Sequence, residues 1–180
     1  MNNQKLEVFN LDRSVYDIQR NIKIPEFLDE DLAYFCGVLS GDGHISNGLE
    51  SKYEINCGGN PADEKEFYDD IIVDLFLRLF NANVKPKENS AGTYGVRMGS
   101  KLIHNFLTNS LNMPKGNKYD NIKIPFLIKQ NELLKKHFIV GLFDTDFGFT
   151  LKKRYKNINY YPVMCFASKS YNFTKEVYEE

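Results

Sequence analysis

The chain has 180 residues and a mass of 20.9 kDa, and its 42% hydrophobic and 14% aromatic residues can fill the core of one large domain or two small ones. No stretch of about 18 apolar residues occurs, which argues against a transmembrane helix, and the first residues lack the apolar run of a signal peptide. Three cysteines are too few for a disulfide scaffold, so we expect a reduced, intracellular protein, either cytoplasmic in a prokaryote or organellar.

The net charge of −1 conceals an uneven distribution of charged residues along the chain. Residues 84–169 hold 15 Lys and Arg against 5 Asp and Glu, whereas the rest of the chain holds 8 against 19. A surface of one sign can bind a polyanion even when the total charge is near zero. The segregation therefore favours a nucleic-acid partner, and its alternative is chance clustering on solvated faces.

The segment Asn-Ile-Lys-Ile-Pro occurs twice, at 21–25 and at 121–125. Each copy leads into a helical pattern, the first over 29–43 and the second over 131–146. Asp29 and Asn131 are placed to act as N-caps, because the side chains of Asp and Asn accept hydrogen bonds from the free N–H groups of a first turn. The repeat predicts two equivalent structural units.

Both predicted helices carry small residues one turn apart, at Gly37 and Gly41 in the first and at Gly141 and Thr145 in the second. Glycine inside a helix costs about 1 kcal/mol relative to alanine, so an offsetting gain is expected. Small residues at this spacing form a flat stripe on which another helix backbone can lie close. We therefore predict that the two stripes pack against each other.

Each predicted helix ends in an acid, Asp42 or Asp146. If the helices pack side by side, the two carboxylates emerge at the same end. Carboxylates repel each other there, and the C-terminus of a helix is already electronegative. A divalent cation would relieve both penalties. The pair therefore favours a metal site, and its alternative is a pair of solvated turn residues.

The remaining patterns predict short strands and two more helices. Strands are expected at 45–46, 53–57, 84–87 and 93–98, and helices at 63–80 and 100–111. Alternation along the strands gives one apolar face and one polar, basic face. Its candidate DNA-binding residues are Lys85, Lys87 and Arg97, joined in the second unit by Lys152, Lys153, Arg154 and Lys156.

The segments 37–43 and 141–148, with the Lys-Ile-Pro repeats and the order of strands and helices, resemble two copies of the motif of the LAGLIDADG homing endonuclease family. The resemblance covers about residues 22–178. It implies an α+β fold of αββαββα half-domains, with the motif helices packed at the interface and antiparallel sheets forming a DNA-binding saddle. The expected boundaries are an N-terminal extension at 1–24, a first half-domain at 25–120 and a second, incomplete half-domain at 121–180.

The resemblance also implies site-specific cleavage of double-stranded DNA with a divalent metal, Mg²⁺ or Mn²⁺. It assigns the metal to Asp42 and Asp146, in one site with the residues that precede them, Gly41 and Thr145. Basic residues near the scissile phosphates would be Lys101 and Lys169. Either lysine could instead be a simple phosphate contact or a solvated side chain.

Two other functions compete with the endonuclease. A binding module of the same fold, such as a maturase that acts on intron RNA or a degenerate endonuclease, would keep the carboxylates without cleaving DNA. A remote alternative is a phosphatase in which Asp144 is the nucleophile, because Asp144 and Asp146 form an Asp-x-Asp pair. Only 34 residues follow Asp146, so we expect a fragment, a degraded reading frame, or self-association that completes the second half.

Overall fold

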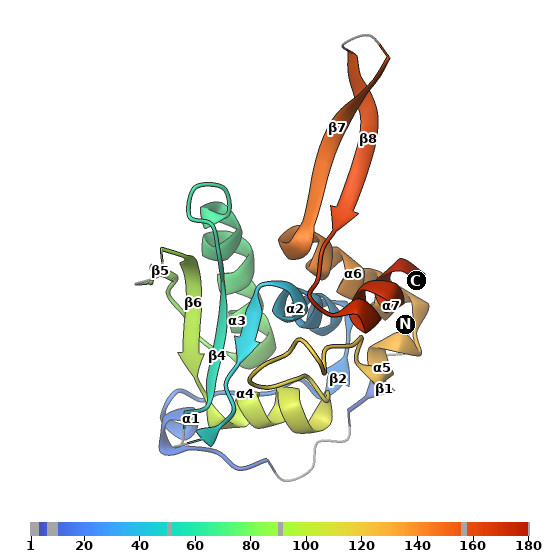
Figure 1. Ribbon diagram of the computed structural model, residues 1–180. Helices are drawn as coiled ribbons and strands as arrows, with labels where there is room; N and C mark the ends of the chain where they lie inside the picture. The colour runs from blue at the N-terminus through green and yellow to red at the C-terminus, as the bar shows by residue number, and fades with distance from the viewer. Residues whose placement is uncertain (1–3, 7–10, 50–51, 90–91, 156–157, 180) are drawn as a thin grey trace.

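The computed structural model describes residues 4–6, 11–49, 52–89, 92–155 and 158–179 (Figure 1). It combines helices with sheets whose paired strands are all antiparallel, which confirms an α+β fold. Among these residues no helix is both long and apolar enough to cross a bilayer. In chain order, with η for a π-helical segment, the elements are β1 (Gln4–Lys5), α1 (Val15–Gln19), β2 (Phe27–Leu28), α2 (Glu30–Gly41), β3 (Gly43–Ile45), β4 (Glu54–Gly59), η2 (Phe67–Ile72), α3 (Val73–Phe80), β5 (Lys87–Glu88), β6 (Tyr94–Gly99), α4 (Lys101–Asn105), η3 (Phe106–Ser110), α5 (Phe126–Lys129), α6 (Glu132–Asp146), β7 (Phe147–Tyr155), β8 (Ile158–Phe166) and α7 (Tyr171–Glu179).

The two helices that follow the repeated segments, α2 and α6, begin at the predicted N-caps. The Asp29 carboxylate accepts a hydrogen bond from the Leu32 N–H at 2.9 Å. The Asn131 side chain accepts from the N–H groups of Leu133 and Leu134, at 3.0 and 3.3 Å. These bonds satisfy donors that a first turn otherwise leaves free, and they fix where each helix starts.

The helices α2 and α6 then pack against each other through their glycines, in the middle of the molecule (Figure 1). A Cβ added at Gly37 would overlap the carbonyl oxygen of Phe138 on α6. Reciprocally, a Cβ added at Gly141 would overlap the carbonyl oxygen of Tyr34 on α2. The two stripes therefore pack against each other as predicted: Gly37 and Gly141 lie directly on the facing backbone, which only residues without a side chain allow, and Gly41 lies against the side chain of Thr145.

The chain between α2 and α6 contains a four-stranded antiparallel sheet in the order β3-β4-β6-β5. Its register pairs Ile55 with Met98 and Cys57 with Val96, and all four side chains are buried on one face. The strands predicted from alternation are confirmed, with boundaries shifted by one to three residues. The predicted helix over 63–80 becomes η2 followed by α3, and that over 100–111 becomes α4 followed by η3.

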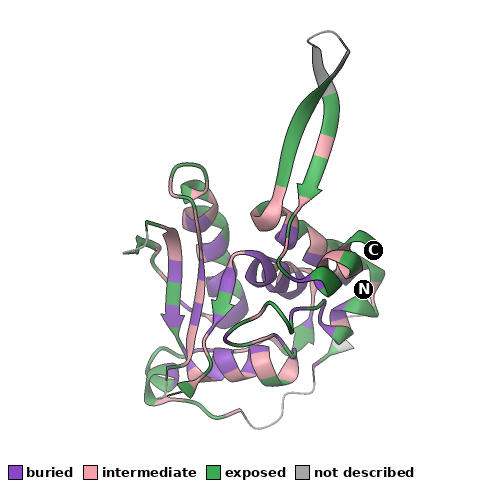
Figure 2. Cartoon of the chain, in the orientation of Figure 1, coloured by how far each residue is buried: buried purple, intermediate pink, exposed green. Residues whose placement is uncertain are grey.

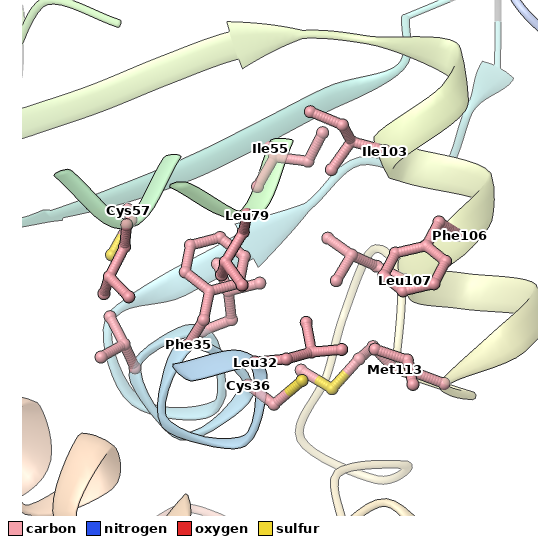
Figure 3. Close-up of a cluster of buried hydrophobic side chains, with 14 of the residues drawn as sticks. Leu32, Phe35, Cys36, Ile55, Cys57, Leu79, Ile103, Phe106, Leu107 and Met113 are labelled. Atoms are coloured by element: carbon pink, nitrogen blue, oxygen red, sulfur yellow. The ribbon is translucent and has the colours of Figure 1, made fainter. Parts of the chain in front are cut away.

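The main core lies between α2, this sheet, α3 and α4. Figure 3 shows Leu32 and Phe35 of α2 directed toward Ile55 of the sheet and toward Phe106 at the start of η3. The ring of Phe35 also packs edge-on against that of Phe76, with centroids 5.1 Å apart. Helix α2 is therefore buried on the side of the sheet as well as on the side of α6, which explains why nearly all of it is apolar or small.

The described residues before position 25 pack as part of this first unit rather than as a separate extension. Strand β1 pairs with β2, and Leu6 and Ile22 join the core. The carboxylate of Asp17, on α1, is 1% exposed and accepts hydrogen bonds from Ser100 Oγ at 2.6 Å and from the Leu102 N–H at 3.2 Å. Asp17 therefore caps helix α4 from a position 83 residues earlier in the sequence.

After α6 the chain forms a long hairpin, β7–β8, that projects from the rest of the molecule (Figure 1). At its base the rings of Phe147 and Phe166 stack with centroids 4.8 Å apart. Above its base, the described side chains of the hairpin are largely exposed on both faces (Figure 2). Helix α7 follows and is anchored by the buried ring of Phe173.

Candidate functional site

Asp42 and Asp146 leave the paired helices α2 and α6 at the same end. Asp42 is the C-cap of α2, whereas Asp146 is the last residue of α6 and β7 begins directly after it. A Cβ added at Gly41 would lie 2.9 Å from the Cβ of Thr145 and 3.3 Å from the Cγ of Asp146. The structure therefore brings these four predicted residues together.

The electrostatics of this end of the helices reflect a surplus of negative charge. Burial, reinforced by the charges of Glu64 and Asp146, raises the pKa of Asp42 to about 6, although a hydrogen bond from Tyr68 Oη at 3.3 Å opposes the rise. Burial likewise raises the pKa of Asp146. A Cβ added at Gly59 would meet both Glu64 and, at 3.2 Å, Asp42 Oδ2. A cation bound here would favour the charged form of all three carboxylates.

Lys118, which the sequence analysis did not single out, brings a positive charge to this place. Its Nζ atom donates to four backbone carbonyl oxygens where α2 ends, those of Leu39 (3.4 Å), Ser40 (2.9 Å), Gly41 and Gly43 (2.9 Å). Burial lowers the pKa of the Lys118 ammonium, and the charges of Asp146 and Asp42 oppose that shift. The ammonium therefore compensates both the helix C-terminus and the carboxylates.

The two acids and Lys118 line a cavity of about 600 Å³. Lys169, predicted to lie near the scissile phosphate, is an exposed residue that lines the same cavity, and its Nζ lies 4.6 Å from the centroid of the Tyr119 ring. The structure therefore brings Lys169 to the carboxylates. The lining also includes His44, at the start of β3, whose side chain is exposed.

Lys101, the other predicted lysine, is not brought to the carboxylates. It follows β6, whose register places Val96 near Asp42 and Gly99 at the far end of the sheet. The Lys101 Nζ forms an ion pair with Asp12 at 2.9 Å. The sheet therefore separates Lys101 from Asp42, and its ammonium binds the N-terminal segment instead.

The predicted DNA-binding residues of the first unit line a second, larger cavity of about 990 Å³ over the polar face of the sheet. Lys85, Lys87 and Arg97 meet there, and the side chain of Arg97 also binds Glu54 at 2.6 and 2.7 Å. Arg20, which follows α1, lines the same groove and was not predicted because its segment had no recognisable role. Four basic residues thus line one concave surface, together with the acids Asp42 and Glu88.

The predicted basic residues of the second unit lie on the β7–β8 hairpin. Lys152 and Lys153 are exposed, and the register of the strands shifts between them. The side chain of Arg154 and the whole of Lys156 lie outside the described residues. These lysines stand on a projecting two-stranded ribbon rather than on a face of the four-stranded sheet (Figure 1).

A divalent ion at this site would have few protein ligands. Over the described ranges no three His, Cys, Asp or Glu side chains are grouped to enclose a metal ion. The residues nevertheless fit Mg²⁺, since this ion often takes one or two carboxylates and completes its shell with water and phosphate oxygens. Asp42 and Asp146 would supply the carboxylates, and the carbonyls that bind Lys118 show that the end of α2 accepts a cation.

Comparison with known proteins adds one similarity. No protein-family model matches the chain. A curated relative, an uncharacterized protein of Methanocaldococcus jannaschii, is 30% identical over 125 residues. The match covers 69% of this chain and 44% of the relative, so the chain spans less than half the length of the protein that it resembles.

Proposed function

We propose that the chain is a site-specific double-strand DNA endonuclease with a divalent metal at Asp42 and Asp146. The observation that carries the proposal is the convergence of these two half-buried carboxylates where two glycine-packed helices end. Paired carboxylates with raised pKa values in a cavity are typical of sites that bind a cation for chemistry. The expected LAGLIDADG-like arrangement of half-domains is part of this proposal.

In this proposal the named residues would bind the metal, neutralise a phosphate or hold the DNA backbone. Asp42 and Asp146 would bind Mg²⁺ or Mn²⁺, which when bound supplies Lewis-acid chemistry for the attacking water and for the leaving oxygen. The exposed ammonium of Lys169 would neutralise a phosphate that enters the cavity. The groove lined by Lys85, Lys87 and Arg97 would hold the DNA backbone, because cations on a concave surface attract phosphates.

A cleavage selection on a randomised DNA library, with and without Mg²⁺, tests the proposal. Asp42→Asn and Asp146→Asn should each abolish cleavage while leaving DNA binding in EDTA within about threefold of the wild type. Asp144→Asn is the matched control, because Asp144 lies on the same helix but is exposed and accepts a hydrogen bond from Tyr34 Oη at 2.6 Å. Cleavage that survives Asp42→Asn would disprove the assignment.

A nucleic-acid-binding module without cleavage is the second candidate, and the position of Lys118 favours it. Its ammonium already offsets part of the negative charge of the carboxylates and of the end of α2 without a metal. In this case DNA or intron RNA would bind in the groove, and no Mg²⁺-dependent cut would appear in the selection. Filter binding with both nucleic acids separates the two partners.

The position of Asp144 bears on the phosphatase alternative. A nucleophilic Asp144 would have to follow a strand, but it lies inside α6, so the geometry disfavours a phosphatase.

Self-association stays a proposal because β7 and β8, among the described residues, pair only with each other and keep unpaired outer edges. Light scattering at high protein concentration tests it, and a monomer would contradict it.

A further inference from the structure

The contact between Lys118 and the end of α2 joins two distant parts of the chain. Lys118 lies in the loop that precedes the second repeated segment, 75 to 79 residues after the carbonyls that it binds. The ammonium donates to the carbonyl oxygens of Ser40 and Gly43 at 2.9 Å and to that of Gly41. These carbonyl oxygens form a cage around the ammonium, whose N–H groups satisfy acceptors that the end of a helix leaves free and whose charge opposes the negative end of the helix.

The charges around the cage are unbalanced without this ammonium. Asp42 and Asp146 both act on Lys118 electrostatically, but Nζ contacts the carbonyls rather than the carboxylates. Glu64 adds a further negative charge beside Asp42. Asp42, Asp146 and the negative end of α2 therefore share the charge of this ammonium.

We infer that Lys118 is a positioning residue that serves as the resident counter-ion of the carboxylate pair, and that a divalent ion competes with its charge. The ammonium holds the end of α2 and keeps Asp42 and Asp146 close while the metal is absent. A metal that binds here is attracted less strongly by the carboxylates, because the positive charge of Lys118 already offsets part of their negative charge. The competition with a divalent ion rests on the proposed function, whereas the counter-ion role of Lys118 does not.

The first experiment measures unfolding in EDTA. Lys118→Met keeps the length of the side chain but removes its charge, and it should lower the melting temperature by about 5 °C or more. Lys115→Met is the matched control, because Lys115 lies three residues earlier in the same loop with an exposed side chain, and its melting temperature should change by less than about 1 °C.

A purely structural cap would give the same loss, so a double-mutant cycle with Asp42→Asn follows. If Lys118 balances the carboxylates, the loss from Lys118→Met should fall to about half or less when Asp42 is already Asn. An equal loss in both backgrounds would overturn the counter-ion role. If Lys118→Met alone does not fold, folding of the double variant supports the role and its failure to fold overturns it.

The second experiment titrates the full chain with Mn²⁺ and follows the free ion by electron paramagnetic resonance. Removing a unit charge beside two carboxylates should tighten Mn²⁺ binding about tenfold or more in Lys118→Met, whereas Lys115→Met should stay within about twofold of the wild type. Unchanged or weaker binding in Lys118→Met would overturn the competition. If no variant binds Mn²⁺, the competition and the proposed metal-dependent function both fail, and the unfolding cycle alone decides the counter-ion role.

Discussion

Replacement of Gly141 by alanine should destabilise the protein even though alanine is the better helix former. The added methyl group would overlap the carbonyl oxygen of Tyr34 and would lie 3.0 Å from the carbon of that carbonyl and 3.1 Å from the Val38 nitrogen. These are backbone atoms in the middle of α2, so no side-chain rotation relieves the contact. The helices α2 and α6 must move apart instead.

The magnitude follows from two opposing contributions. Alanine gains about 1 kcal/mol of helix propensity over glycine. Overpacking in a close-packed interior costs about 1–3 kcal/mol, and separating two helix backbones also loosens the side chains around them. Because the overlapped atoms belong to a helix backbone, the overpacking cost should lie at the top of this range, about 3 kcal/mol. We therefore expect a net loss of about 2 kcal/mol, which for a chain of this size lowers the melting temperature by about 4–8 °C.

Guanidinium-chloride unfolding followed by circular dichroism measures this change, with Gly148→Ala as the control. A Cβ at Gly148 has no neighbour within 4 Å, so that variant should stay within about 0.5 kcal/mol of the wild type. Gly37→Ala should match Gly141→Ala, and the double variant should lose less than the sum, because one separation relieves both contacts. A Gly141→Ala variant at least as stable as the wild type would refute the close approach of the helices.

Three further predictions concern other parts of the molecule. Burial alone would raise the pKa of Asp17, but hydrogen bonds from Ser100, Ser14 and Leu102 outweigh burial and lower the pKa. The stability that the Asp17 carboxylate adds to the fold is therefore complete above the unfolded pKa near 3.8 and is lost as the pH falls below that value. Asp17→Asn should cost about 3 kcal/mol at pH 7 and less at pH 3, and equal costs by urea unfolding would contradict this. Cys165 is exposed, whereas burial raises the pKa of Cys36 and of Cys57 to about 12, so one thiol should react with a disulfide reagent in the native protein and three in urea. Arg20→Ala should weaken DNA binding and reduce the slope of log affinity against log salt by about 1, and an unchanged slope would exclude Arg20 from the interface.

Much of the fold could be predicted because it follows local periodicity. The N-caps Asp29 and Asn131, the glycines of the helix stripes and the alternation of the strands are readable within a few residues of sequence. The facing of Gly37 and Gly141 followed from the cost of glycine in a helix, which a close contact offsets.

The charged partners could not be predicted, because they depend on where distant loops fold back. Lys118 lies outside every periodic pattern, yet the loop places its ammonium on the end of α2. Lys101 was predicted to lie near the scissile phosphates, and it lies away from the carboxylates because sequence alone does not say at which end of a sheet a strand finishes. Asp17 caps α4 across 83 residues, and no local signal marks such a cap.

The backbone contact between Gly37 and Gly141 also sets the order in which the molecule can be assembled during synthesis. About 100 residues separate the two glycines, so at typical translation rates α2 leaves the ribosome roughly 5–20 s before its partner helix exists. The sheet, α3 and α4 are made in that interval and can cover the other side of α2. Until α6 is made, the face of α2 that carries Gly37 has no partner, and the α6 of a neighbouring chain on the same messenger can pack there. A higher density of ribosomes on the messenger should consequently favour exchanged dimers, because the α6 of a neighbouring chain is then available within that interval.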